Sequence, residues 1–193
     1  MKIGLYFGTF NPVHIGHTIL ANHMLHYTDM DEVWMVVTPH NPHKKKSTLL
    51  DNHHRLEMVY KATEQFEDIH PTDIEFKLKQ PNYTVDTLVH ISEKFPNNEF
   101  VLIMGEDNLR TFHKWKNYEV ILEHYEVYVY PRIGDKIIGE NNLKNHNKIH
   151  FVEAPIVEIS STFIRQSIKN NKSVKHLLLP EVCEYIDLMN FYK

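Results

Sequence analysis

Short, dense blocks of apolar residues alternate along the chain with longer stretches in which apolar positions recur every three or four residues. The dense blocks favour β-structure and are typical of parallel strands buried on both faces. They predict strands at 2–7, 32–38, 100–104 and 127–130, with weaker candidates at 74–78 and 148–152. The periodic stretches predict helices at 17–27, 51–66, 84–95, 115–124, 161–170 and 180–190. This alternation predicts an α/β fold, with a doubly wound, mostly parallel sheet and helices on both faces.

The residues that are least expected in an ordinary core gather where the predicted strands end. Ligands of a doubly wound sheet bind outside the carboxyl ends of its strands, at the point where the strand order reverses. The segments that follow the strands read GTFNPVHIGH, PHNPHKKK, QPNYTVDT, GEDNLRTFHKW and PRIG, and EISSTFIR opens a later helix. We therefore expect the functional site at this edge of the sheet.

The composition is that of an ordinary globular protein, and it narrows the range of partners. With 193 residues, 42% apolar and 24% charged, we expect one domain, 1–193, in which 159–193 is a C-terminal helical part. The net charge of −4 argues against a nucleic-acid partner but not against a small anionic ligand. One cysteine, a short apolar start and no run of about 20 apolar residues predict a cytoplasmic protein without a membrane partner. A homo-oligomer is compatible with the sequence.

The segment after the first strand has the features of a phosphate site. Gly8 permits close approach of a ligand to the backbone. The N–H groups of Thr9 and Phe10 lie near the start of a helix, where free N–H groups and the helix dipole attract anions. His14 and His17 are spaced so that both imidazoles face the same way on a helix. Helix-end amides beside two imidazoles indicate a site for phosphate groups.

Two motifs resemble those of a known superfamily. The chain has neither a Walker loop nor a G-x-G-x-x-G fingerprint. Instead, HIGH at 14–17 resembles the H-x-G-H signature of the nucleotidyltransferases, and ISSTFIR at 159–165 resembles their I-S-S/T-T-x-I/V-R motif. Class I aminoacyl-tRNA synthetases share the HIGH signature, but they are much longer and carry a K-M-S-K-S loop that this chain lacks. The resemblance implies a Rossmann-like sheet of the nucleotidyltransferase type.

Three further segments are similar to nicotinate-nucleotide adenylyltransferases. NPHK at 41–44 resembles their Pro-Pro-His-Lys element, NYTVDT at 82–87 their Ser-Tyr-Thr element, and GEDNLRTFHKW at 105–115 their Gly-x-Asp…Phe…Trp element. The resemblance covers almost the whole chain. It implies synthesis of deamido-NAD from ATP and nicotinate mononucleotide, with release of pyrophosphate, in NAD biosynthesis. The chain departs from the family pattern at Phe7, Asn11, Asn41 and Asn82.

The resemblance also implies roles for individual residues. The catalytic contacts to the triphosphate would come from His14, His17, Lys44 and Arg165. ATP would be held further by Gly8, Thr9, Phe10, Gly16, Gly105, Asp107, Ile159, Ser160, Ser161 and Thr162. The nicotinate ring would be bound by Tyr83, Thr84, Thr87 and Trp115. A nearby phosphate should favour protonated imidazoles, and Mg²⁺ is implied as an ion that bridges the phosphates without protein ligands.

Other interpretations stay open at the level of the sequence. The acceptor could be nicotinamide mononucleotide or phosphopantetheine, or the reaction could transfer a cytidylyl group from CTP. The chain could also be a non-catalytic nucleotide-binding module, although it retains both histidines and Arg165. A structural zinc site is disfavoured, because one cysteine and scattered histidines lack the spacing of such sites.

Overall fold

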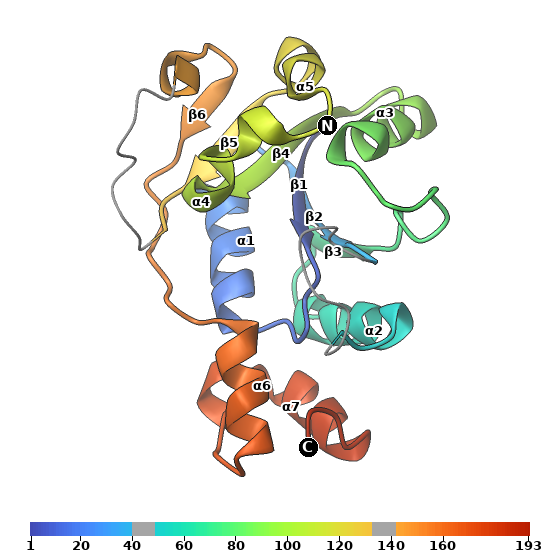
Figure 1. The fold of residues 1–193 in the computed structure, drawn as a ribbon, viewed down its shortest axis with the longest axis vertical. Helices are drawn as coiled ribbons and strands as arrows, with labels where there is room; N and C mark the ends of the chain where they lie inside the picture. The colour runs from blue at the N-terminus through green and yellow to red at the C-terminus, as the bar shows by residue number, and fades with distance from the viewer. Residues whose placement is uncertain (40–48, 133–141) are drawn as a thin grey trace.

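The computed structural model describes residues 1–39, 49–132 and 142–193. The strands are β1 (Lys2–Gly8), β2 (Glu32–Val37), β3 (Ile69–Thr72), β4 (Glu99–Gly105), β5 (Val127–Tyr130) and β6 (Ile149–Phe151). The α-helices, shown in Figure 1, are α1 (Ile15–Tyr27), α2 (Asn52–Thr63), α3 (Thr84–Lys94), α4 (Glu106–Leu109), α5 (Tyr118–His124), α6 (Ser161–Lys169) and α7 (Pro180–Leu188). Short 3-10 helices are η2 (Phe112–Lys114), η3 (Asn142–Asn145) and η4 (Lys175–Leu177).

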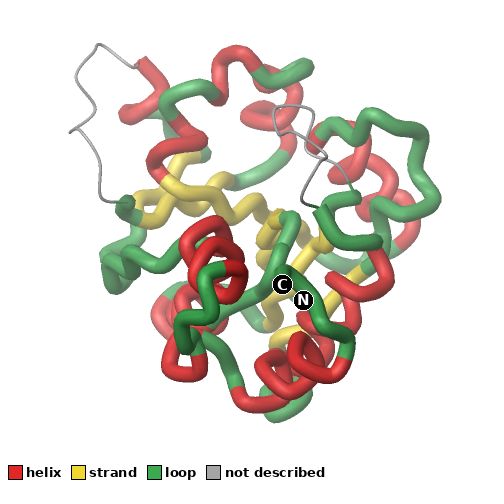
Figure 2. Tube along the Cα trace, turned by 60° about the horizontal axis from the view of Figure 1, so that its bottom comes forward, coloured by secondary structure: helices red, strands yellow, loops and turns green. Residues whose placement is uncertain are grey.

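In the described ranges, six strands form one sheet in which every neighbouring pair is parallel. Their order is β3-β2-β1-β4-β5-β6, so the strand order reverses between β1 and β4. Doubly wound sheets bind ligands at this switch point, outside the carboxyl ends of the strands. Figure 2 shows the strands as a central layer with helices around them.

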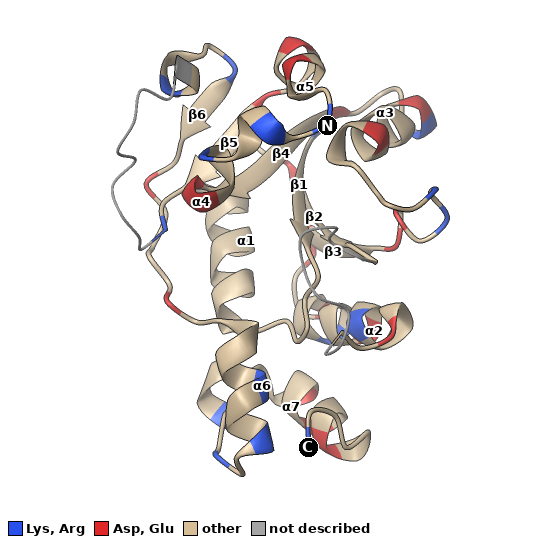
Figure 3. Cartoon of the chain, in the orientation of Figure 1, with Lys and Arg blue, Asp and Glu red and all other residues tan. Residues whose placement is uncertain are grey.

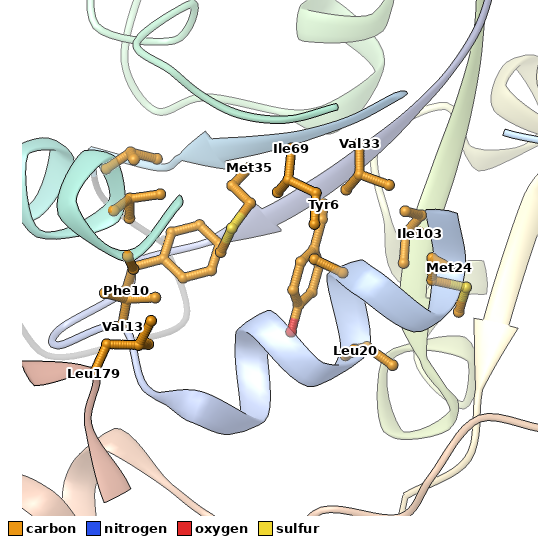
Figure 4. Close-up of a cluster of buried hydrophobic side chains, with 14 of the residues drawn as sticks. Tyr6, Phe10, Val13, Leu20, Met24, Val33, Met35, Ile69, Ile103 and Leu179 are labelled. Atoms are coloured by element: carbon orange, nitrogen blue, oxygen red, sulfur yellow. The ribbon is translucent and has the colours of Figure 1, made fainter. Parts of the chain in front are cut away.

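Each face of the sheet has its own hydrophobic core, because neighbouring residues of a strand point to opposite faces. In β1, Tyr6 belongs to one cluster and Leu5 to the other. Side chains of α1, α2 and α7 pack in the cluster of Tyr6, whereas α3 and α5 contribute to the cluster of Leu5. The cluster of Tyr6 extends to Phe10 and Val13, near Leu179 (Figure 4). The expected doubly wound fold with helices on both faces is therefore confirmed.

One expected strand is wrong. The segment 74–78 forms turns, in which the N–H of Phe76 donates to the carbonyl of Asp73 at 2.8 Å. The strand of this region is instead β3, at the edge of the sheet beside β2. Pro71 lies within β3 and weakens its sequence signal, but an edge strand tolerates a residue that cannot donate to the sheet.

The other expected elements are confirmed, most of them with shifted ends. The helix expected at 17–27 begins at Ile15, which brings His14 to the N-cap position. The helix expected at 115–124 begins at Tyr118, because Asn117 before it adopts a left-handed conformation with φ of 50°. The turn α4 was not expected, since four residues are too few to show a helical period.

The C-terminal helices pack back onto the first half of the chain. The Ser160 hydroxyl accepts a hydrogen bond from the N–H of Phe163 and caps α6, and Pro180 begins α7. Val182 and Ile186 of α7 join the same core cluster as α1 and α2. Basic residues occur along α6 (Figure 3). This packing brings the second motif to the end of β1.

Candidate active site

The loop after β1 turns sharply over a buried aromatic ring. Phe10 has a φ of 44°, and its side chain is only 2% exposed. A Cβ atom on Gly8 would lie 2.7 Å from the ring of Phe10, so glycine is required where the loop folds over it. Because the ring belongs to the core, only the backbone of Phe10 can face a ligand.

The two histidines of the H-x-G-H motif are held against each other at the start of α1. His14 is the N-cap, and its ring stacks on that of His17 with centroids 3.6 Å apart. The N–H of His14 donates to Nδ1 of His17 at 3.1 Å, and Phe10 packs edge-on against His17 at 5.1 Å. Since Nδ1 accepts, the proton of neutral His17 lies on Nε2, which is thereby a hydrogen-bond donor. The shared orientation that the spacing predicted is confirmed.

His14 is nearly inaccessible and neutral. Its side chain is buried, and among the described residues its Nδ1 has no hydrogen-bond partner. Burial, followed by the positive charge of Arg132, lowers the pKa of His14 to about 4. His14 is therefore neutral at pH 7 in this structure, in contrast to the protonated form expected beside a phosphate. The negative charge of a phosphate would oppose both effects, and a buried nitrogen without a partner suits a ligand contact.

A pocket opens between the start of α1 and the end of β5. Its lining comprises Tyr6, His14, Gly16, His17, Leu20, Tyr130, Pro131, Arg132, Pro155, Val157 and Ile159. A Cβ atom on Gly16 would lie 3.0 Å from Val157 and 3.1 Å from Nδ1 of His14, so glycine leaves room for the histidine. Gly16 of the first motif and Ile159 of the second line the same pocket, and their binding of ATP stays a prediction.

A basic and aromatic group on this pocket was missed at the level of sequence. The Arg132 guanidinium lies 5.5 Å from the ring centre of Tyr130 and donates to its hydroxyl at 3.4 Å. Its Nε is 3.9 Å from a carboxylate oxygen of Asp107. Tyr130 pairs with Gly105 in the sheet. Burial raises the pKa of Tyr6, so the Tyr6 hydroxyl stays protonated. Arg132 lies two residues after the end of β5, and this position near a strand end was the available signal.

The second motif holds the first loop through hydrogen bonds. The Ser161 hydroxyl donates to the carbonyl of Pro12 at 2.8 Å. The Arg165 guanidinium donates to the carbonyl of Asn11 at 2.7 Å and to the hydroxyl of Thr162 at 3.2 Å. The two motifs therefore meet in space. Ser161 and Arg165 position the loop, and their contacts to phosphate stay a prediction.

Asn11, one of the departures from the family pattern, is an acceptor within this junction. Its side chain is 3% exposed, and its Oδ1 accepts from the N–H of Leu50 at 3.3 Å and from the hydroxyl of Tyr192 at 2.8 Å. A carboxylate would present an oxygen at the same place, so asparagine preserves the acceptor of the usual aspartate. The end of the chain is tied to the first loop in this way.

The residues expected to bind nicotinate lie around the start of α3 and the η2 turn. Tyr83 is the N-cap of α3, so Thr84 begins the helix, where N–H groups lack partners within the helix. Tyr83 is 38% exposed, and the ammonium group of Lys116 lies 4.7 Å from the centre of its ring. Trp115 packs edge-on against Phe112 at 5.2 Å. Ring binding by these residues stays a prediction.

Thr87 faces a buried carboxyl group that was also missed. Its hydroxyl donates to Oε1 of Glu75 at 2.7 Å. Burial raises the pKa of Glu75, while hydrogen bonding from Thr87 and Thr38 acts in the opposite direction. The N–H of Thr38 donates to the carbonyl of Gly8 at 2.9 Å, and Asn82 donates from Nδ2 to the Glu75 carbonyl at 3.1 Å. Glu75 therefore connects the nicotinate segment to the end of β2 beside the first loop.

Lys44 and Asn41 lie outside the described residues, so the role expected of Lys44 stays a prediction. Over residues 1–39, 49–132 and 142–193, no three His, Cys, Asp or Glu side chains gather as a metal site requires. No helix in those same ranges is both long and apolar enough to cross a membrane.

Comparison with known sequences agrees with this arrangement. A sequence model described as cytidylyltransferase-like matches residues 5–167. A protein of Flavobacterium johnsoniae named "Probable nicotinate-nucleotide adenylyltransferase" is 67% identical over 194 residues, covering 100% of both chains. A protein of the same name from Bacteroides thetaiotaomicron is 42% identical, covering 96% of this chain and 91% of that protein.

A solved structure has the same fold. The nicotinic acid mononucleotide adenylyltransferase of Plasmodium falciparum, complexed with NaAD, superposes with a TM-score of 0.82. It is 22% identical, and the match covers 99% of this chain and 97% of that one. At this identity the likeness concerns the fold, whereas the sequence relatives match over nearly their full length. The chain belongs to the cytidylyltransferase-like family and, within it, to the nicotinate-nucleotide adenylyltransferases.

Proposed function

We propose that the protein transfers the adenylyl group of ATP to nicotinate mononucleotide, which yields deamido-NAD and pyrophosphate in NAD biosynthesis. The observation that carries this proposal is the meeting of His14 and His17 with the start of α6 at the end of β1. Relatives that match the whole chain are named for this activity. The related enzyme of Plasmodium falciparum has been solved complexed with NaAD and with APC.

The chemistry requires alignment and charge stabilisation rather than a protein nucleophile. An oxygen of the acceptor 5′-phosphate forms a bond to the α-phosphorus of ATP. The bond from that phosphorus to the bridging oxygen breaks, and pyrophosphate leaves with the electron pair. Nε2–H of His17 would donate to the phosphate oxygens on which charge develops, and His14 would accept a proton as the anion approaches.

The pocket beside the two histidines would hold ATP. The backbone of Gly8, Thr9 and Phe10 would face the α-phosphate, and Ser160, Ser161, Thr162 and Arg165 the outer phosphates. Arg132, with Tyr130 and Asp107, suits the adenosine moiety, because a guanidinium and an aromatic ring favour a flat base. Lys44 would add a point charge. Mg²⁺ would enter on ATP and take phosphate and water oxygens as its ligands.

The acceptor would bind near α3 and η2. Trp115 and Tyr83 offer aromatic surfaces for the nicotinate ring, and the first N–H groups of α3, beginning at Thr84, suit its carboxylate. We propose that residues 1–193 act as one domain, because α7 shares its core with α1 and α2. A cytoplasmic location is proposed from the sequence, which contains one cysteine.

The test is pyrophosphate release with ATP and Mg²⁺, comparing nicotinate mononucleotide, nicotinamide mononucleotide and phosphopantetheine as acceptors. We expect a strong preference for nicotinate mononucleotide. Preference for another acceptor would support adenylyl transfer but contradict the nicotinate-binding role proposed for the segment from Asn82 to Trp115. Absence of release with every acceptor would contradict the proposal.

A further inference from the structure

Arg55 on α2 is a fully buried arginine whose hydrogen bonds reach three separate segments of the chain. Its side chain is 0% exposed. It donates from Nε to the Leu50 carbonyl at 3.0 Å, from one terminal nitrogen to the carbonyls of Thr9 at 2.6 Å and Thr38 at 2.8 Å, and from the other to the Pro39 carbonyl at 3.1 Å and to Oδ1 of Asn52 at 2.6 Å. Within the described part of the chain, none of these partners is a carboxylate.

The hydrogen bonds of this guanidinium are therefore accepted by carbonyl oxygens, and the negative charge of Asp51 adds to them without being one of these partners. Burial lowers the pKa of Arg55 to about 10, so the group stays charged at pH 7. An apolar side chain would fill the same space without the cost of removing a charge from water. A planar group with five N–H donors is, however, suited to hold several carbonyls at fixed directions, which neither an apolar residue nor lysine can do.

Three of the four backbone carbonyls that Arg55 holds follow the ends of the neighbouring strands β1 and β2. Thr9 follows β1, and Thr38 and Pro39 follow β2. In a trans peptide the carbonyl and the following N–H point in opposite directions. Because the Thr9 carbonyl points toward Arg55, the N–H of Phe10 points away from it. The positive charge also lies directly behind the loop that would receive the triphosphate.

We propose that Arg55 is a positioning residue for adenylyl transfer. It fixes the Thr9–Phe10 peptide so that the Phe10 N–H is aimed at the α-phosphate, and its buried charge adds positive potential at that point. Arg55 itself does not touch the substrate. The inference rests on the proposed function, and it assigns part of the catalytic geometry to a residue outside both sequence motifs.

The test compares Arg55→Lys with Met58→Ala and with the unaltered protein. Lysine keeps the charge but cannot hold carbonyls in three segments at once. Met58 is fully buried on the same helix, packs in the core, and reports the effect of destabilisation alone. The melting temperature, kcat, both KM values and the Kd for ATP without acceptor are measured for each protein, well below the lowest melting temperature.

We expect R55K to lower kcat at least ~30-fold and to leave the KM for nicotinate mononucleotide within ~3-fold, as for the loss of a donor aimed at the transition state. M58A should keep kcat within ~3-fold of the unaltered protein, even if its melting temperature falls as much as that of R55K. Equal losses of kcat in both variants, or an R55K effect confined to KM, would overturn the positioning role.

The binding measurement separates this inference from the proposed function. If the unaltered protein released no pyrophosphate with any acceptor, the proposed function would be wrong. The Kd for ATP would then decide on Arg55, since a misdirected Phe10 amide should weaken ATP binding about 5-fold in R55K only. Equal Kd values in R55K and M58A would overturn the positioning role in that case.

Discussion

The proposed phosphate end and the proposed acceptor end of the site are built in different ways. At the phosphate end, which comprises the first loop, the two histidines and the start of α6, rings and carbonyls are fixed by stacking and by hydrogen bonds to the backbone. His14 there is 5% exposed. At the acceptor end, which comprises Tyr83, Thr84 and Trp115, Tyr83 is 38% exposed, and its neighbour Lys116 forms an exposed ion pair with Asp86 at 2.8 Å.

This difference separates reaction chemistry from substrate choice. Stabilising the charge that develops in phosphoryl transfer requires donors that do not move, and buried contacts provide that rigidity. Recognition of a ring can depend on a few surface side chains, which change at little cost to the fold. Changes at the phosphate end should therefore affect kcat with every acceptor, and changes at the acceptor end should affect KM for one acceptor.

The largest expected effect is that of His17→Ala. Loss of the Nε2–H donor should lower kcat roughly 10²–10³-fold with every acceptor, as for removal of one charge-stabilising donor. Steady-state kinetics at saturating ATP measure this loss. His23→Ala on the same helix is the control, because His23 stacks on the exposed Tyr27 at 4.5 Å, away from the loop. Near-normal turnover of the His17 variant would remove the distinction between the two ends.

The next effect concerns stability and pH at the phosphate end. The folded protein holds His14 neutral, with its pKa lowered to about 4 from 6.5, so the unfolded chain binds the proton more readily between these values. The free energy of unfolding should therefore fall by roughly 3 kcal/mol as the pH decreases from about 6.5 to 4. Urea unfolding across this range measures it. His14→Gln should flatten the slope, His23→Gln should not, and an unchanged slope in H14Q would contradict the burial argument.

A smaller effect is expected at the acceptor end. Trp115→Ala should raise the KM for nicotinate mononucleotide about 10-fold, through loss of ring contacts, and leave the KM for ATP nearly unchanged. Trp115→Phe should retain most of the affinity. A loss confined to kcat would show that Trp115 supports the reacting groups, which would weaken the division between the ends.

The smallest effect tests the connection between the ends. Because burial raises the pKa of Glu75, the folded state binds its proton more tightly than the unfolded state. Stability from this group is present at low pH and is lost as the pH rises from 4.5 through the raised value. The Glu75 contribution opposes that of His14, so Glu75→Gln should make the free energy of unfolding rise more steeply with pH above 4.5, with the exposed Glu67→Gln as control. A shallower rise in E75Q than in the unaltered protein would contradict this sign.

Sequence alone determined the class of fold and the two motifs that meet at the end of β1. Buried strands appear as dense apolar blocks and helices as periodic ones, because each element must bury a face, and this pattern survives without knowledge of contacts. The apolar residues of segment 74–78 predicted a strand that does not form, while Pro71 weakened the sequence pattern of the actual strand β3. The H-x-G-H and ISSTFIR motifs were readable because stacked rings, a helix cap and anion-binding amides need particular residue types at fixed spacing.

Only the tertiary structure decided what supports that site. Arg55, Glu75 and Arg132 carry no local motif, since their partners come from strands and loops far away in the sequence. The low pKa of His14 likewise depends on burial and on Arg132, which spacing within α1 cannot show. Local patterns specify the groups that meet a ligand, whereas burial and long-range hydrogen bonds, which exist only after folding, decide their charge and direction.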